Sequence, residues 1–164
     1  ISEDEFRGLP AKDLVGHLGC WTYFMSLDTP ENKDFIASWN KWLETTDAPG
    51  VEKQGRVTCS PMNLSRIGAY IRKQAVEKAK STDVDKVIAA MAGQTFKAPS
   101  GIVSKMDEKN HHLHKSVFIG EIKADGQFNV VWKTPGPVKA QPWSPFIPEN
   151  KGKKDEPVVV AAKK

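Results

Sequence analysis

The sequence predicts an α/β fold. Three observations indicate this class: an uncharged aromatic run at residues 19–27, apolar stripes at helical spacing between residues 30 and 92, and a change to a period of two after residue 95. A sheet covered on both faces needs several buried strands, yet only one such run comes before the helices. The chain therefore has the pattern of the second half of a larger α/β unit.

The run at residues 19–27 (GCWTYFMSL) is the first predicted strand. A continuous apolar run of this length is typical of a strand buried on both faces, as in a parallel sheet. Trp21 and Tyr23 are two residues apart, so they are expected to share one face of this strand. The uncharged stretch from Leu14 to Leu27 is shorter than the roughly 20 residues of a membrane span, so membrane insertion is not expected.

Three helices are predicted to follow. The first begins at residues 28–31 (DTPE), which combine an N-cap candidate, a proline at the first helical position and an acid facing the helix dipole. The second covers about residues 60–80, and the third is capped by Thr82 or Ser81 and stopped by Gly93. The apolar stripes contain Phe35, Ile36, Trp39, Trp42 and Leu43 in the first helix, Leu64, Ile67, Ile71 and Ala75 in the second, and Val84, Val87, Ile88 and Met91 in the third.

The last part of the chain predicts strands and then an extended segment. Residues 102–106 form a short candidate strand, and residues 117–123 and 127–132 flank Ala-Asp-Gly, which is a strong hairpin signal. From Pro135 onward the chain contains five prolines before residue 149. Because proline lacks a backbone N–H, we expect this segment to run in extended form over a surface.

Charge and motif content exclude several function classes. The net charge is +4, but residues 151–164 contribute +3 of it, so the body is nearly neutral and a nucleic-acid partner is not indicated. The sequence has no Walker motif, no nucleophile elbow and no GxGxxG pattern, and Cys20 and Cys59 each lack a nearby histidine. We therefore expect neither an enzyme nor a cofactor-binding protein.

Four residues are candidates for a ligand site. Trp21 and Tyr23 could stack on, or hydrogen-bond to, a small polar ligand if the end of their strand opens on a cleft; otherwise they are core aromatic residues. Ser2 and Glu3, with Glu5 beside them, could line the same cleft if a strand precedes residue 1, and carboxylates there suit ligands rich in N–H donors such as amides or urea. The alternative is that Ser2 and Glu3 belong to an ordinary acidic first turn of a helix.

Three histidines form a second cluster. His111, His112 and His114 could bind a transition metal, but a closed zinc site needs about four ligands and no cysteine pair is near. The competing interpretation is a polar connector that leads into the strand at residue 117, and it is the one we expect. No metal is therefore predicted.

Several stretches resemble a known family. They are residues 21–33 (WTYFMSLDTPENK), 74–79 (QAVEKA), 81–87 (STDVDKV), 93–101 (GQTFKAPSG), 110–113 (NHHL), 120–128 (GEIKADGQF), 131–137 (VWKTPGP) and 142–145 (PWSP). Together they resemble the C-terminal part of the urea and short-chain-amide substrate-binding proteins of ABC transporters, over about residues 1–152. The resemblance implies a two-lobed type I periplasmic-binding-protein fold, of which this chain would be a C-terminal fragment.

The resemblance also implies an organisation and a site. Residues 1–26 would finish the sheet of the second lobe, residues 27–112 would form a first-lobe segment with three helices, and residues 113–164 would return to the second lobe with the hairpin and the Pro-rich, Lys-rich tail. In the family, residues that match Ser2, Glu3, Trp21 and Tyr23 lie at or near the cleft. After residue 152 the resemblance ends, which leaves the origin of the Lys-rich tail open.

The sequence departs from the family at Arg66 and Arg72, where aromatic residues are expected on the second helix. Each arginine flanks the apolar stripe, so it lies either in the core as a costly charge or at the core's edge with an extended stem. The function implied is a periplasmic or exported solute-binding component that delivers urea or an amide to an ABC permease. The alternative is a structural or interaction module that binds no ligand of its own and associates through exposed sheet edges.

Overall fold

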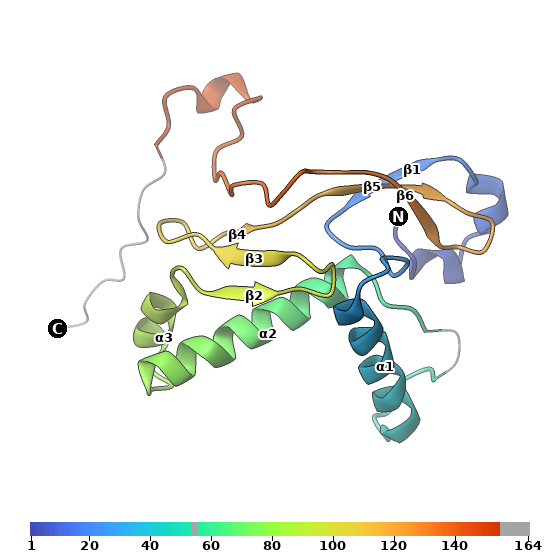
Figure 1. Cartoon of the computed structure of the whole chain (residues 1–164), viewed down its shortest axis with the longest axis horizontal. Coiled ribbons are helices and arrows are strands. Elements are labelled where there is room, and N and C mark those ends of the chain that lie inside the picture. Colours follow the sequence, from blue (N-terminus) through green and yellow to red (C-terminus); the bar gives the residue numbers. More distant parts are fainter. Residues whose placement is uncertain (54–55, 155–164) are drawn as a thin grey trace.

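The computed structural model describes residues 1–53 and 56–154 of the 164-residue chain (Figure 1). Its described part contains two three-stranded antiparallel sheets and three α-helices. The first sheet has the order β1 (Leu18–Trp21), β5 (Phe118–Ile122), β6 (Phe128–Lys133), and the second has the order β2 (Thr95–Lys97), β3 (Val103–Met106), β4 (Leu113–His114). The helices are α1 (Pro30–Thr45), α2 (Ser60–Ala79) and α3 (Val84–Met91), and short 3-10 turns lie at Glu5–Arg7, Ala11–Leu14 and Pro148–Asn150.

The predicted strand at residues 19–27 is wrong in length and in pairing. Strand β1 has four residues, alternates between exposed and half-buried positions, and pairs antiparallel with β5, with Cys20 opposite Ile119. Tyr23 and Phe24 are fully buried but lie after the strand has ended. The apolar run signals burial correctly, but the buried residues belong to a bend that leads from β1 to α1.

Helix α1 begins where the sequence predicts. Thr29 is the N-cap, and its hydroxyl accepts a hydrogen bond from the backbone N–H of Asn32 at 3.1 Å, while Pro30 occupies the first helical position. The stripe is only partly covered, because Phe35 and Leu43 are buried but Trp42 is 43% exposed and stacks on Trp39. The apolar stripe of α1 is therefore covered at Phe35 and Leu43 and left partly open at Trp42.

Helices α2 and α3 pack together beneath the second sheet (Figure 1). Ile67, Ile71 and Ala75 are buried as predicted for α2. In α3 the N-cap is Asp83, not Ser81 or Thr82, and its carboxylate accepts from the N–H of Lys86 at 3.1 Å. Val84 was expected to face inward, but as the first helical residue it is 68% exposed.

The two arginines of α2 lie at the edge of its apolar face. The guanidinium of Arg66 is half-buried and lies 5.3 Å from the ring centroid of Phe35 on α1 and 5.1 Å from that of Tyr70. A guanidinium between two aromatic rings gains cation–π attraction while its head stays hydrated. Arg72 is exposed, so neither arginine is an unpaired charge in the core.

The hairpin is confirmed and the Pro-rich segment is not as predicted. Strands β5 and β6 pair through the turn at residues 124–126, where Gly126 has a φ of 77° and donates its N–H to the Lys123 carbonyl at 3.0 Å. After a single bridge between Lys115 and Val138, residues 139–154 stand away from the sheets and fold back on themselves (Figure 1). Contacts within this segment replace the expected contacts with a surface of the body.

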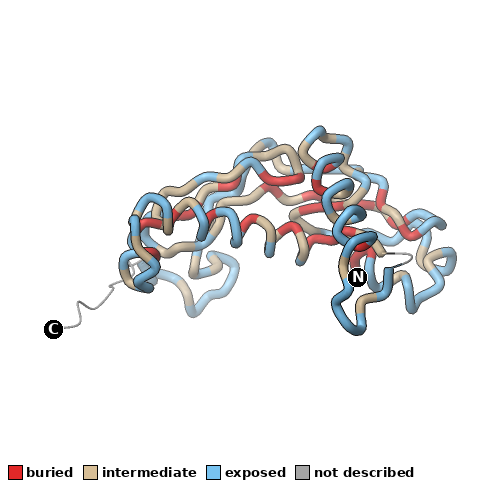
Figure 2. The backbone as a smooth tube through the Cα atoms, turned by 90° about the horizontal axis from the view of Figure 1, so that it is seen from below, coloured by how far each residue is buried: buried red, intermediate tan, exposed pale blue. Residues whose placement is uncertain are grey.

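Buried residues are spread along the molecule instead of gathering in one centre (Figure 2). One cluster joins Phe24 to Phe118, Ile122 and Phe128 of the first sheet. Two others lie between α2, α3 and the second sheet, built on Ile67, Ile71, Ala98 and Met106 and on Ala75, Val87 and Ala90. The chain crosses between these packed regions at residues 22–29 and at residues 115–117.

Candidate functional site

A buried polar cluster surrounds Tyr23 where the chain crosses from β1 to α1. The Tyr23 hydroxyl donates to Asn32 Oδ1 at 2.7 Å and shares a 2.7 Å hydrogen bond with the Thr58 hydroxyl. All three side chains are at most 1% exposed. Burial raises the pKa of Tyr23 far above its usual value, so the phenol stays neutral and keeps its donor.

Asn32 holds the crossing segment against the first turn of α1. Its Nδ2 donates to the carbonyl of Met25 at 2.8 Å and to that of Leu27 at 2.7 Å. Because its Oδ1 accepts from Tyr23, one amide side chain satisfies three polar groups in the interior. The crossing is therefore fixed by side-chain hydrogen bonds where no strand ladder is present.

Glu3 reaches the same crossing from the N-terminal turn. Its Oε1 accepts the Met25 N–H at 2.6 Å, and the residue is 2% exposed. Its Oε2 is buried and has no hydrogen-bond partner among the described residues. Burial raises the pKa of Glu3 to about 7, and the charge of Glu3 in turn helps to raise the pKa of Tyr23. Glu3 is therefore a buried acid with one oxygen that is not used by the described residues.

The other two predicted site residues use their polar groups within the N-terminal turn. The N–H and hydroxyl of Ser2 both donate to Glu5 Oε2, at 2.6 and 2.8 Å, which lowers the pKa of Glu5. Trp21 Nε1 donates to the Ile1 carbonyl at 2.8 Å. The structure thus brings Glu3 and Tyr23 to the crossing, whereas Ser2 and Trp21 hold the first residues of the chain.

The N-terminus of α2 adds polar groups that are not among the four predicted site residues. Cys59 is the N-cap without a side-chain capping bond, and the Ser60 hydroxyl lies 3.1 Å from the Thr22 hydroxyl. Asn63 is 1% exposed, and its Oδ1 has no partner among the described residues. Burial, followed by the charges of nearby acids with Glu3 the largest, raises the pKa of the Cys59 thiol. The signal in the sequence was the polar run Thr-Cys-Ser directly before Pro61.

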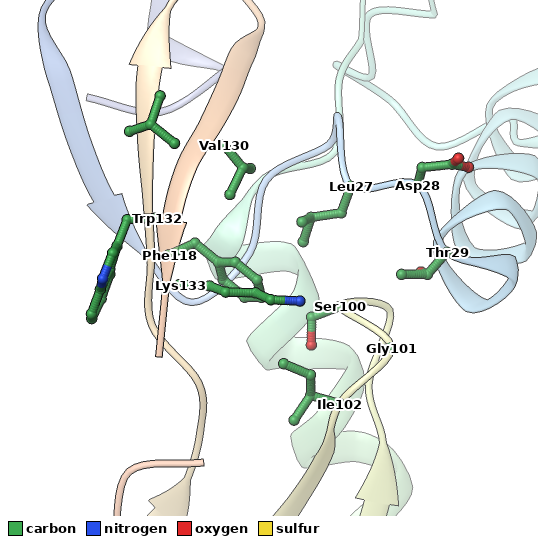
Figure 3. Close-up of a pocket in the computed structure, with 11 residues that line it drawn as sticks. Leu27, Asp28, Thr29, Ser100, Gly101, Ile102, Phe118, Val130, Trp132 and Lys133 are labelled. Atoms are coloured by element: carbon green, nitrogen blue, oxygen red, sulfur yellow. The ribbon is translucent and has the colours of Figure 1, made fainter. Parts of the chain in front are cut away.

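A cavity of about 680 Å³ lies between the two sheets on the path of the crossing (Figure 3). Its walls come from residues 27–29, from the turn between β2 and β3, and from β5 and β6; they include Leu27, Asp28, Ser100, Ile102, Phe118, Val130 and Lys133. The Thr29 hydroxyl donates to the Pro99 carbonyl at 2.7 Å, which fixes the β2–β3 turn to the start of α1. None of Ser2, Glu3, Trp21 and Tyr23 lines this cavity.

The three histidines have different surroundings and do not share a set of partners. His114 Nε2 lies 2.9 Å from Asp107 Oδ2, and hydrogen bonds from the Lys109 backbone, then from His114, lower the pKa of Asp107. His111 has a φ of 54°, and His112 donates its N–H to Asn110 Oδ1 at 2.9 Å. Within residues 1–53 and 56–154, no three His, Cys, Asp or Glu side chains meet in a group that could hold a metal ion.

Replacing Tyr23 with phenylalanine tests the polar cluster. The ring would remain buried, but Asn32 Oδ1 and the Thr58 hydroxyl would each lose a partner in a region closed to water. We expect the free energy of unfolding to fall by about 1–3 kcal/mol. Guanidinium unfolding measures this, and Tyr70→Phe, at a 39% exposed position on α2, is the control that should change little. Equal stability of the two variants would show that the cluster contributes nothing.

The helices that the structure describes include none with the length and apolar character needed to cross a bilayer. Comparison with curated proteins finds a protein named limonene hydroxylase from Geobacillus stearothermophilus, 35% identical over 132 residues, which cover 80% of this chain and 22% of that protein. The expectation that the chain is not an enzyme is contradicted by this relative, which carries an enzyme's name. The missing catalytic motif is no guide here, because the chain matches less than a quarter of the relative.

Solved structures show the fold. A solute binding protein of an ABC transporter from Rhodopseudomonas palustris HaA2, in complex with p-hydroxybenzoic acid, superposes with a TM-score of 0.66 at 22% identity, over 84% of this chain and 36% of that one. An amino acid ABC transporter substrate-binding protein from Pseudomonas fluorescens Pf-5 gives a TM-score of 0.64 at 21% identity, over 85% and 35%. The chain thus spans about a third of the length of these proteins.

The family match covers almost the whole described chain. Residues 1–149 match the family described as periplasmic binding protein domain. The match includes the N-terminal turn with Glu3, both crossings, all three helices and both sheets, and it ends inside the Pro-rich segment. The predicted α/β fold of the periplasmic binding proteins is confirmed, and this chain belongs to the periplasmic binding protein domain family.

Proposed function

We propose that this chain is part of the solute-binding component of an ABC importer that takes urea or short-chain amides. The family supports solute binding, and the observation that carries the choice of solute is the buried Glu3 carboxyl with its unused Oε2. The protein would work in the periplasm or after export and hand the solute to a membrane permease. Ser2, Trp21 and Tyr23 would form the surroundings of Glu3 in this site.

The chemistry of Glu3 favours a neutral solute with N–H donors. A carboxylate accepts hydrogen bonds, so amide and urea nitrogens fit its unused oxygen. The carboxylate group of a benzoate would meet the ionised form of Glu3 as a like charge in a desolvated place, because Glu3 is 2% exposed. An N–H-bearing solute is therefore preferred to an anionic one.

The proposed mechanism is closure of two lobes about the crossings. We assign residues 1–26 and 115–154 to one lobe and residues 27–114 to the other. The boundary that the sequence implies at residue 113 moves to residues 115–117, because β4 (Leu113–His114) pairs with β3. The pairing of β1 with β5 supports the grouping of the first and last segments. A solute held at Glu3 beside the crossing would favour the closed arrangement through contacts that only this arrangement completes.

Substitution of Glu3 by glutamine tests the proposal in the protein that contains this chain. Glutamine keeps one acceptor for the Met25 N–H but places an NH₂ donor where Oε2 was, opposite the donors of the solute. We expect acetamide and urea affinities to fall about tenfold or more. Asp4→Asn, one residue away and exposed, is the matched control and should leave them unchanged.

Calorimetric titration with acetamide, urea, 4-hydroxybenzoate and leucine separates the outcomes. The proposal requires binding of an amide or urea that is weakened by Glu3→Gln and not by Asp4→Asn. Binding of 4-hydroxybenzoate or leucine in preference to the amides would overturn the choice of solute. Amide binding that is indifferent to Glu3→Gln would overturn the site.

A further inference from the structure

The segment of residues 139–154 is a closed hook that projects from the body. Trp143 Nε1 donates to the Lys154 carbonyl at 3.2 Å, and the Lys153 ammonium lies 4.4 Å from the centroid of the Trp143 ring. Asn150 closes the middle of the hook by donating to the Ser144 carbonyl at 3.1 Å. In Figure 1 this segment, drawn in red, stands clear of both sheets. All of these contacts lie within residues 139–154, so the hook is held together by its own residues.

The tip of the hook is apolar and uncovered. Phe146 is 92% exposed, more than any other large hydrophobic residue of the described chain, and its neighbour Ile147 is 49% exposed. Isolated exposed apolar residues are common on proteins, but two adjacent large ones at the end of a projection are not covered by anything the fold supplies. The tip has the chemistry of an anchor that enters an apolar phase.

Positive charge gathers on the hook. Lys139, Lys151 and Lys153 line a cavity of about 610 Å³ next to Trp143, and Lys154 follows directly. All four lysines are exposed, and Glu149 is the only acidic residue between positions 135 and 154. The hook therefore carries a net charge of +3, whereas the rest of the described chain is close to neutral.

We propose that the hook binds the surface of a membrane rich in anionic phospholipid. Phe146 and Ile147 would enter the boundary between head groups and acyl chains, and the lysines would lie against the phosphates. Trp143 suits this depth, because its ring is apolar and its N–H is already satisfied. The family match ends at residue 149, so it includes Trp143, Phe146 and Ile147 and leaves out the last three lysines of the hook. The proposed membrane contact uses none of the residues proposed for solute binding and does not depend on that function.

The exposed, projecting ring of Phe146 fits a membrane better than it fits an acidic protein. A protein partner would have to offer a pocket for a projecting ring, whereas a lipid surface accepts one anywhere. The contribution of each lysine near an anionic surface is comparable to that of a partly inserted apolar side chain. The lysines and the apolar tip are thus both needed for membrane binding, and substitutions can remove each of them separately.

Vesicle sedimentation tests the hook with the whole chain. We expect binding to vesicles that contain phosphatidylglycerol, weak binding to phosphatidylcholine alone, and loss of binding as salt is raised. The double substitution Lys139→Gln with Lys151→Gln should weaken binding about thirtyfold, and Phe146→Ser about tenfold. Because these side chains are exposed, the variants should fold as the parent does.

Matched controls lie on the body of the molecule. Val84→Ser removes a large apolar side chain that is 68% exposed on α3, and Lys41→Gln with Lys78→Gln removes two exposed helical lysines. Equal losses in the hook variants and these controls would overturn the proposal. Tighter binding of a polyglutamate peptide than of anionic vesicles would overturn the proposal by assigning the hook to an acidic protein. Tighter binding of glycerol phosphate than of the vesicles, with no effect of Phe146→Ser, would overturn it by assigning the hook to a soluble anion.

Discussion

Replacing Phe24 with alanine should lower the free energy of unfolding by about 3–5 kcal/mol. The side chain is fully buried, and its ring centroid lies 4.5 Å from that of Phe128. Gly120 of β5 is shaped to receive it, since a Cβ built there would lie 2.9 Å from Phe24 Cε2. Removal of the ring therefore leaves a cavity lined by a glycine, which has no side chain to fill it.

Guanidinium unfolding followed by tryptophan fluorescence measures this loss. Phe146→Ala is the matched control, because that phenylalanine is 92% exposed and its removal should change stability by less than about 0.5 kcal/mol. A second arm, Gly120→Ala, adds a methyl group to the same contact and should cost about 1–3 kcal/mol through overpacking. Phe24→Ala as stable as the parent would mean that the crossing is not packed on the first sheet.

The titration of Glu3 should by itself lower the free energy of unfolding by about 3 kcal/mol as the pH rises from 4 to 8. The unfolded chain releases this proton near the ordinary pKa of 4.5, whereas burial holds the pKa of the folded protein at about 7. The folded state thus binds more protons between these values. The stabilising contribution is complete below pH 4.5 and is lost as the pH rises through 7.

The difference between the parent and Glu3→Gln isolates this effect from other titrations. Unfolding free energies measured from pH 4 to pH 8 should diverge in favour of the glutamine variant, with most of the change between pH 4.5 and 7. Asp4→Asn removes an exposed carboxylate at the next position in the chain. The plot of its unfolding free energy against pH should run parallel to that of the parent. Parallel curves for Glu3→Gln would show that the carboxyl is not desolvated.

The elements that local chemistry determines were predictable. Thr29 and Pro30 begin α1 because a cap and a fixed φ act within one turn, and Asp125 with Gly126 closes the hairpin because a positive φ is needed there. The cap of α3 was misplaced by one or two positions because Ser81, Thr82 and Asp83 are all good caps. Only the observed bond from Lys86 to Asp83 selects among them.

The crossing and the site depend on distant partners and were not predictable in detail. A run of buried residues looks the same whether it forms a strand or a bend, so Tyr23 and Phe24 were placed in a strand. Glu3 was proposed as a ligand residue on its chemistry, but its bond to Met25 and its unused oxygen arise from a contact across 22 residues. Thr58 was not singled out, because short polar side chains before a helix are common in exposed turns.

Tyr23 and Phe24 are adjacent, yet one is hydrogen-bonded to α1 and to the segment before α2, and the other is packed into the first sheet. On the backbone only the ψ of Tyr23 and the φ of Phe24 lie between these residues, because the peptide bond is planar, and the side-chain torsions of the two rings complete the path. A rotation of the first sheet relative to the helices at this crossing must therefore be taken up by these few torsion angles or by breaking one attachment. The crossing is thus a short connection that resists large rotations between the two packed regions.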